Sequence, residues 1–201
     1  MHEDKDIVVL SKPKGMPVHP APGSQSHQRG TLVNFLCHKY GDLPFVEGKQ
    51  HQPGIVHRID QDTSGIMVVA RTEEAYSSLS KKFREHDIER RYVALSHGIV
   101  PLENSVGTID TLIGKNEKDI KRRAVVSKNA EDARRAITHY KVLERFNFNN
   151  KRQQQSSFSL IETSLVTVSH QNSFHLSFFF KTLLTEIYSI FFFLNLLHLY
   201  L

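Results

Sequence analysis

Residues 54–72 read GIVHRIDQDTSGIMVVART, and this stretch decides how the whole chain is interpreted. It places a carboxylate, Asp60, shortly before the turn-forming residues Thr-Ser-Gly at 63–65. Apolar runs at 55–59 and 66–70 flank the carboxylate, and short apolar runs bounded by turn residues are typical of buried strands. The stretch therefore predicts two short strands joined by a loop that presents Asp60, as in many active sites.

Three other roles for the carboxylates stay open from these residues alone. Residues 62–65 read Asp-Thr-Ser-Gly and resemble an aspartic-protease signature, but the glycine falls one position late and a protease dyad would need a homodimer. Asp60 and Asp62 share one face of an extended segment, so the pair could bind Mg²⁺, although Arg58 on that face argues against a cation. Either aspartate could instead only cap the turn, the commonest role of aspartate before such residues.

Turn residues and apolar periodicity outline the remaining elements. Thr31 and Thr72 stand where N-caps are expected, each before a stretch of helical character. The second of these helices is expected to bury a stripe of Ala75, Leu79 and Phe83. Further strands are expected at 6–10, 91–100 and 136–143. Strands outnumber helices and several connections are too short for helical crossovers, which predicts an α+β fold on a largely antiparallel or mixed sheet with flanking helices.

The cysteine content and the opening residues argue against a disulfide-rich fold, a multi-cysteine zinc site and a secreted protein. The 201 residues contain one cysteine, Cys37, which excludes an internal disulfide framework and a multi-cysteine zinc site. The opening MHEDKDIVVL lacks a basic segment followed by an apolar one, so no secretory signal is predicted. We therefore expect an intracellular protein, in the cytoplasm or an organelle, rather than a secreted one.

Positive charge is concentrated in one part of the chain. Residues 115–152 hold 12 Lys and Arg against 5 Asp and Glu, a local net charge of +7. That excess favours a polyanionic partner such as a nucleic-acid backbone, with a solvated basic surface as an equal alternative. Residues 11–23, SKPKGMPVHPAPG, are expected to form a proline-rich loop that contains Lys12, Lys14 and His19. For these three residues, contacts to the same partner and a purely structural role carry equal weight.

The last 33 residues, from Ser169, differ in composition from the rest, because they hold 7 of the 13 phenylalanines and neither proline nor glycine. Neither strand alternation nor helical spacing is sustained in this tail. Its longest uncharged stretch, 187–201, has 15 residues. A bilayer needs roughly 20, so membrane insertion is not predicted.

Several stretches together resemble the RluA-type RNA pseudouridine synthases, whose signature is His-Arg-Leu-Asp-x-x-Thr-Ser-Gly. Residues 57–65 match this signature, with Ile59 in place of the leucine. Five further stretches match in the family's order: DIVVLSKPKGMPVHPAPG at 6–23, ERRYVALSHGIV at 89–100, GTIDTLIGKN, KRRAVV and SLIETSLVT. The resemblance ends near Thr167 and implies the α+β fold of that family's catalytic domain.

The resemblance implies a role for each matching residue. Asp60 stands at the family's catalytic aspartate, expected to act as the nucleophile while uracil is detached from ribose, turned and rejoined through carbon 5. Aspartate side chains are ionised in water at neutral pH, as this role requires. Arg58 matches the arginine expected to fill the gap left by the flipped uridine. Tyr92 matches a tyrosine that packs on the target uracil, with a core tyrosine as the alternative.

The other implied contacts are with RNA, expected to be ribosomal RNA, which makes the implied activity an RNA-modifying isomerase. Thr63 belongs to the segment expected to fix the loop. Lys121, Arg122 and Arg123 form a cluster expected to contact phosphates, which positions RNA without reading its sequence. Neither a metal nor an organic cofactor is implied.

The chain departs from the family after Thr167. The family continues with Gly-Arg-Thr-His-Gln-Ile-Arg, whose basic residue pairs with the catalytic aspartate, whereas this sequence reads VSHQNSFHL and has no arginine after Arg152. We therefore expect a truncated catalytic domain at 1–167 and a non-family apolar tail at 168–201, of intron-derived or frameshifted origin. Because a carboxylate without its cation is poorly oriented, a catalytically impaired RNA-binding remnant is the alternative to an active enzyme.

Overall fold

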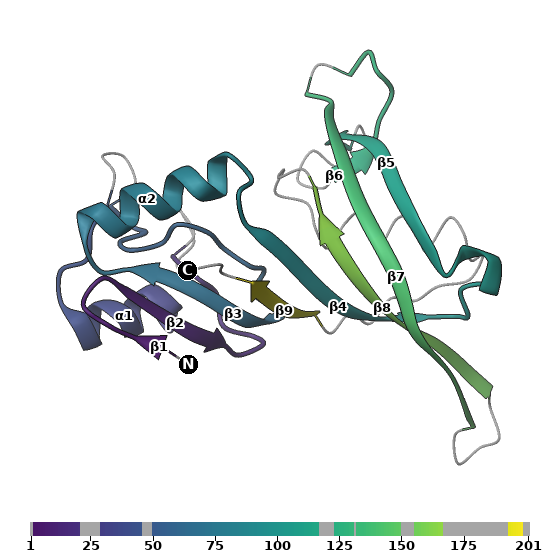
Figure 1. Cartoon of the computed structure of the whole chain (residues 1–201), viewed down its shortest axis with the longest axis horizontal. Coiled ribbons are helices and arrows are strands. Elements are labelled where there is room, and N and C mark those ends of the chain that lie inside the picture. The colour runs from purple at the N-terminus through teal and green to yellow at the C-terminus, as the bar shows by residue number, and fades with distance from the viewer. Residues whose placement is uncertain are drawn as a thin grey trace. The chain divides into compact units, whose positions relative to one another are not determined.

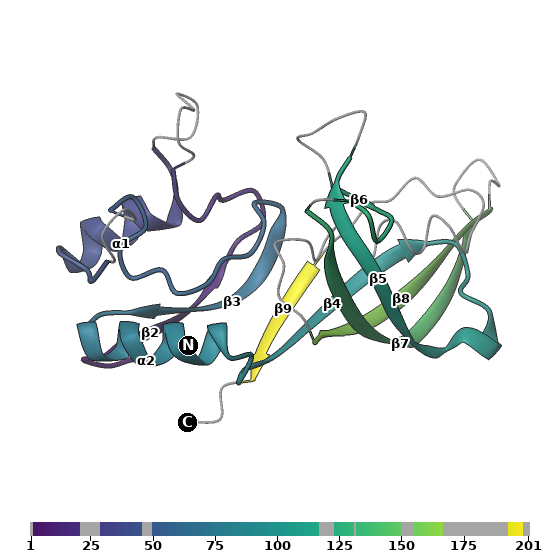
Figure 2. The same cartoon turned by 90° about the horizontal axis from the view of Figure 1, so that it is seen from above.

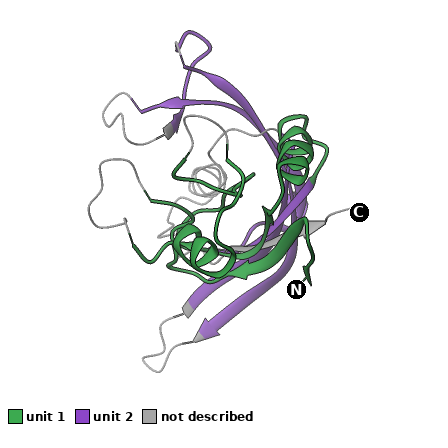
Figure 3. Cartoon of the chain, turned by 90° about the vertical axis from the view of Figure 1, so that its left-hand side faces the viewer, with its two compact units in different colours: residues 1–88, 193–201 green, residues 89–192 purple. Residues whose placement is uncertain are grey.

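The computed structural model describes residues 2–20, 29–45, 50–116, 123–130, 132–149, 155–166 and 193–198. The chain forms two compact units, which Figure 3 shows in different colours. Unit 1 comprises residues 1–88 and 193–201, and unit 2 comprises residues 89–192. The helices and strands of both units are labelled in Figure 1.

Unit 1 has a mixed set of strands. They are β1 (His2–Glu3), β2 (Ile7–Lys12), β3 (Thr63–Ala70) and β9 (Phe193–His198), in the order β1-β2-β3-β9. β2 and β3 are antiparallel, whereas β9 runs parallel to β3. The strands predicted at 6–10 and 66–70 are confirmed. The register pairs Lys12, the last residue of β2, with Gly65 near the start of β3, so Lys12 lies where the Asp60 loop enters the sheet.

Two helices lie on opposite sides of the β2–β3 pair (Figure 2). α1 (Leu32–Tyr40) begins at Thr31, whose hydroxyl accepts the Asn34 amide while the Asn34 side chain accepts the Thr31 amide, which forms a capping box. α2 (Glu73–Arg84) begins at Thr72, whose hydroxyl accepts the amide three residues further on. Both predicted caps are confirmed, because threonine oxygens satisfy amides that have no partner within the helix.

The face of the β2–β3 pair under α2 holds a core of unit 1. Its buried residues are Ile7, Val68 and Ile88, and the partly buried Ala75, Leu79 and Phe83 pack against them, among others. The predicted stripe of α2 is therefore confirmed, and Tyr76, which is also buried, widens it. Residues 67–70 of β3 are fully buried on both faces. Burial on both faces explains why this part of the sequence is apolar throughout instead of alternating.

Unit 2 consists of antiparallel strands in the order β4-β8-β7-β5-β6. Its elements are β4 (Glu89–His97), a 3-10 turn (Leu102–Asn104), β5 (Val106–Lys115), β6 (Arg123–Val125), β7 (Arg134–Asn149) and β8 (Gln155–Leu165). The strands predicted at 91–100 and 136–143 correspond to β4 and to part of β7. With the two helices of unit 1, these strands confirm the predicted α+β class on a largely antiparallel and mixed arrangement.

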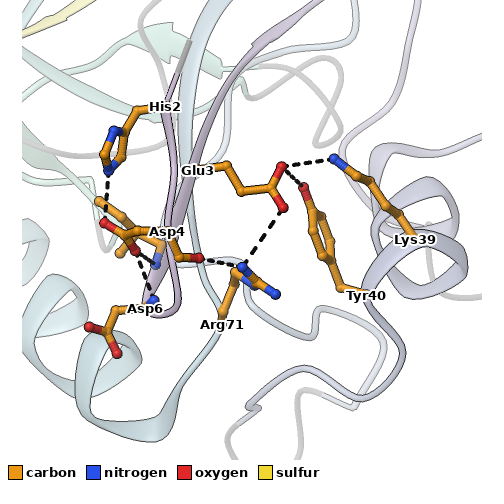
Figure 4. A network of polar contacts seen from close by, with 8 residues as sticks. His2, Glu3, Asp4, Asp6, Lys39, Tyr40 and Arg71 are labelled. Carbon is orange, nitrogen blue, oxygen red and sulfur yellow. Dashed lines mark hydrogen bonds and ion pairs between the residues drawn. The ribbon is translucent and has the colours of Figure 1, made fainter.

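A polar network joins three distant segments at one edge of unit 1 (Figure 4). Glu3 of β1 accepts hydrogen bonds from Lys39 Nζ and Tyr40 Oη at the end of α1, both at 2.9 Å. These two hydrogen bonds lower the pKa of Glu3. Arg71, just after β3, donates to the backbone carbonyl of Asp4 and lies 3.8 Å from the Glu3 carboxylate. The network thus fixes the β1 hairpin against α1 and the end of β3.

The prediction of a strand at 55–59 is wrong. Ile55 forms a single antiparallel bridge with Val69, and residues 56–59 have no strand pairing. The next outward-facing amide of β3, that of Val68, donates to the side chain of His57 instead of to a backbone carbonyl. The ladder of backbone hydrogen bonds therefore stops, and the chain leaves the sheet before Asp60.

Gly54 begins this segment with a φ of +71°. A Cβ atom at Gly54 would lie 2.7 Å from the Ala70 carbonyl oxygen and 2.9 Å from Val69 Cγ1. Gly54→Ala is therefore expected to lower the free energy of unfolding by about 2–4 kcal/mol, from positive-φ strain together with a backbone clash. Gly15→Ala is the matched control in urea denaturation, because Gly15 has a φ of +86° and no atom within 4 Å of its Cβ position. It is expected to lose only about 1 kcal/mol, and equal losses would contradict tight packing at Gly54.

Candidate active site

The Asp60 loop exposes three consecutive residues, 60–62, between two buried side chains. Ile59 is 6% exposed and Thr63 is 5% exposed, whereas Arg58, Asp60 and Asp62 are exposed. The amide of Thr63 donates to the backbone carbonyl of Asp60 at 3.1 Å, which closes a turn at the start of β3. Two buried side chains thus anchor the loop on either side of Asp60, while its carboxylate points away from the core.

Gln61 fastens this loop to the proline-rich loop that follows β2. Its backbone carbonyl accepts the amide of Gly15 at 2.8 Å, and its side-chain amide donates to the carbonyl of Gly15 at 3.1 Å. These reciprocal bonds join positions that are 46 residues apart. Gln61 lies between the two aspartates, so its fixed backbone limits the movement of Asp60 and of Asp62.

Lys12 donates to the same Gln61 carbonyl that accepts the Gly15 amide. Its side chain is fully buried, and Nζ donates to the carbonyls of Pro13 at 3.1 Å, Met16 at 2.8 Å and Gln61 at 3.0 Å. Burial lowers the pKa of Lys12, and the negative charges of Asp62 and Asp60 oppose this shift. Three carbonyls occupy the three protons of an ammonium group. Of the two roles left open for Lys12, the burial and the three hydrogen bonds support the structural one.

Arg58 is held by a histidine of the proline-rich loop. Its Nη1 lies 3.1 Å from Nε2 of His19, and Nδ1 of His19 lies 2.9 Å from the carbonyl of Pro20. A guanidinium only donates and a carbonyl only accepts, so the His19 ring is neutral, with its proton on Nδ1. Burial lowers the pKa of His19, with the Pro20 carbonyl opposing and the charge of Arg58 adding to the shift. Arg58 and Asp60 are therefore both positioned by the proline-rich loop.

The structure bears on two of the alternative roles for Asp60 and Asp62, the turn cap and the metal site. Within the part of the chain that the structure describes, neither the Asp60 nor the Asp62 carboxylate accepts a hydrogen bond from residues 63–65, so the turn-cap role is not observed. In the same residues no three His, Cys, Asp or Glu side chains gather as a metal-binding group. What the loop offers is an exposed carboxylate, held by its neighbours and close to a buried ammonium group.

The remaining predicted site residues lie in unit 2 or outside the described residues. Tyr92 lies on β4 opposite Val93 and Leu95, as its position in the alternation predicts, but its side chain is only 4% exposed. It pairs across the sheet with Thr163 of β8. Lys121 and Arg122 fall outside the described residues, and Arg123 is described only as the first residue of β6. The structure therefore brings together Arg58, Asp60 and Thr63 in unit 1, while Tyr92 belongs to unit 2.

A sequence model of the RNA pseudouridylate synthase family matches residues 6–172. The chain belongs to this family. An uncharacterized RNA pseudouridine synthase of Bacillus subtilis is 40% identical over 178 residues, which are 88% of this chain and 52% of that protein. The ribosomal large subunit pseudouridine synthase D of Pseudomonas aeruginosa is 41% identical over 146 residues, which are 73% of this chain and 41% of that protein. The predicted resemblance is thus confirmed.

Solved structures of the pseudouridylate synthase family confirm the fold. Human RNA pseudouridylate synthase domain containing 4 has a TM-score of 0.60 and 29% identity, covering 88% of this chain and 62% of that chain. Human RNA pseudouridylate synthase domain containing 1 has a TM-score of 0.67 at 22% identity, a likeness of fold alone. The chain spans about half the length of the curated relatives it matches. Neither of the helices that the structure describes is long and apolar enough to cross a membrane.

Proposed function

We propose that this chain is an RNA pseudouridine synthase that converts uridine to pseudouridine, with ribosomal RNA as the substrate. The observation that carries the proposal is the exposed Asp60 carboxylate at the signature position, on a loop that Lys12 and Gln61 fix to the proline-rich loop. The relatives named as ribosomal large subunit pseudouridine synthases support the substrate class. Because RNA is an intracellular molecule, the proposed site of action is intracellular.

In the proposed mechanism Asp60 is the nucleophile. The bond between ribose C1′ and uracil N1 breaks, the uracil turns, and a bond forms between C1′ and C5. The hydrogen on C5 leaves as a proton and N1 gains one, so the reaction is an isomerisation that needs no external reactant. A charged carboxylate suits covalent or electrostatic participation at C1′. The exposure of Asp60 leaves it open to a nucleotide turned out of its stack.

Arg58 is proposed to occupy the space that the extruded uridine vacates. Its planar guanidinium is suited both to phosphate and to the face of a neighbouring base. The contact with neutral His19 at 3.1 Å supports this role, because it holds the guanidinium on the same loop as Asp60 without neutralising it. Tyr92 is proposed to pack on the target uracil, Thr63 to hold the turn, and Lys121, Arg122 and Arg123 to contact phosphates.

A catalytically impaired RNA-binding remnant is the second candidate. One sequence observation favours it: there is no arginine after Arg152, where the family has a basic partner for its catalytic aspartate. The basic segment 115–152 and the Asp60 loop would be kept in such a protein. RNA binding without isomerisation distinguishes it from an active enzyme.

The test uses the full chain and an unmodified transcript of large-subunit ribosomal RNA. After incubation, pseudouridines are labelled chemically and mapped by primer-extension stops, and RNA binding is measured with the same transcript over a salt titration. An active synthase is expected to give at least one stop that heat-denatured protein does not give. RNA binding without any stop would support the remnant, and failure to bind RNA would refute both candidates.

A further inference from the structure

His57 takes the place of a backbone carbonyl beside β3. The Ala70 amide donates to the Gly54 carbonyl at 2.9 Å, and Ile55 bridges Val69 in antiparallel register. If this ladder continued, the next carbonyl to accept from β3 would belong to the residue opposite Val68. The Val68 amide instead donates to Nε2 of the His57 imidazole at 3.0 Å.

This substitution explains where the chain leaves the sheet. Val68 is fully buried, and a buried amide needs an acceptor. Because the imidazole supplies that acceptor, the main chain from residue 56 onward is free to turn away from β3. Asp60 follows three residues after His57, so the His57 ring lies at the start of the Asp60 loop.

The same ring is fixed in a second direction by α2. His57 stacks on Phe83 with 4.4 Å between the ring centroids and 17° between the ring planes. Phe83 lies in the last turns of α2, which itself packs against the core that contains Val68. A hydrogen bond fixes the position of Nε2 and the stacking fixes the plane of the ring, so the backbone at residue 57 has little freedom.

An imidazole nitrogen accepts a hydrogen bond only when it carries no proton. The contact with the Val68 amide therefore requires the tautomer with its proton on Nδ1. Phenylalanine at this position would keep an aromatic ring for the stack but would lack the acceptor. Glutamine would lack the ring, and its Oε1 could reach the place of Nε2 and accept the amide.

We propose that His57 is a positioning residue for the catalytic loop: its unprotonated Nε2 ends the β3 ladder and thereby sets the position of Arg58 and Asp60. This inference rests on the proposed pseudouridine synthase function for its catalytic consequence. The structural consequence, a protected Val68 amide and an ordered loop, is independent of that function.

The test compares His57→Phe with His57→Gln in the full chain, with two readouts. In hydrogen exchange, the Val68 amide is expected to exchange faster in His57→Phe and to keep most of its protection in His57→Gln. In pseudouridine formation, His57→Phe is expected to lower kcat by about 10–100-fold with little change in KM, because small displacements of a catalytic group have effects of this size. His57→Gln is expected to recover most of this loss.

The outcomes separate this inference from the proposed function. Equal protection of the Val68 amide in both variants, or equal kcat, would overturn the positioning role. Absence of pseudouridine formation by the unmodified protein would count against the proposed function alone, since the exchange readout would still decide whether His57 holds the loop. A nitrogen NMR spectrum of the unmodified protein in which Nε2 of His57 carries the proton would also overturn the inference.

Discussion

Asp60→Asn is expected to abolish pseudouridine formation, lowering kcat by about three orders of magnitude or more, as the loss of a catalytic nucleophile does in other enzymes. Asparagine has nearly the same size and shape as aspartate but is a poor nucleophile and carries no charge. Because the Asp60 side chain is exposed and accepts no hydrogen bond among the described residues, the substitution breaks no structural contact there. The fold and the affinity for RNA are expected to change little.

Asp62→Asn is the matched control for this variant. Asp62 is exposed on the same loop, two residues away, and its charge acts on Lys12 as the charge of Asp60 does. Both variants therefore remove one negative charge from the same loop. Asp62→Asn is expected to keep kcat within about tenfold of the unmodified protein, since it removes no group from the reaction. Comparable losses in both variants would indicate that the loop needs its total charge rather than one nucleophile.

The same comparison decides between the two candidate functions. If the unmodified chain forms pseudouridine and Asp60→Asn does not, the residues of this chain are sufficient for catalysis. If none of the three proteins forms product while all bind RNA equally, the remnant is supported. Product formation that persists in Asp60→Asn would refute the assigned mechanism.

Sequence patterns predicted the elements whose formation depends on local contacts. Thr31 and Thr72 cap helices because a hydroxyl reaches an amide only three residues away, and such spacing is visible in the sequence. The apolar run at 66–70 became part of a strand because several consecutive residues are buried there. The site signature likewise lies within nine consecutive residues, 57–65.

The features that the sequence did not predict depend on contacts between distant residues. The run at 55–59 has the composition of a strand, but the side chain of His57 takes the amide that a strand would have paired. In the sequence Lys12 looks like an ordinary surface lysine. Its burial depends on a hydrogen bond to the carbonyl of Gln61, which is 49 residues later in the chain. Neither contact has a local pattern, since each depends on the fold as a whole.

Lys12→Met is expected to destabilise unit 1 and to disorder the Asp60 loop. Methionine has about the same length as lysine, but it cannot donate to the carbonyls of Pro13, Met16 and Gln61. The loss of these three part-buried hydrogen bonds is opposed by the gain from no longer burying an ammonium group. Because the ammonium has all three of its hydrogen bonds here, we expect the loss to dominate, lowering the free energy of unfolding by about 2–4 kcal/mol.

Lys14→Met separates this effect from a general loss of positive charge in the proline-rich loop. Lys14 is exposed two residues away, so its replacement is expected to change the free energy of unfolding by less than about 0.5 kcal/mol. Urea denaturation of both variants gives the difference, and hydrogen exchange at Gly15, whose amide donates to Gln61, reports on the contact between the two loops.

Lys12→Met is also expected to lower kcat, because the Lys12 ammonium group holds the backbone of the Asp60 loop. Gln61 would keep its bonds to Gly15 in Lys12→Met, but the carbonyl between the two aspartates would lose its charged donor. A loop that is merely less stable would recover full kcat at low temperature, where the folded state is fully populated. A loop that depends on the ammonium group for its geometry would keep a reduced kcat even then. We expect the second result, because Lys12 donates directly to the backbone carbonyl of Gln61, the residue between the two aspartates.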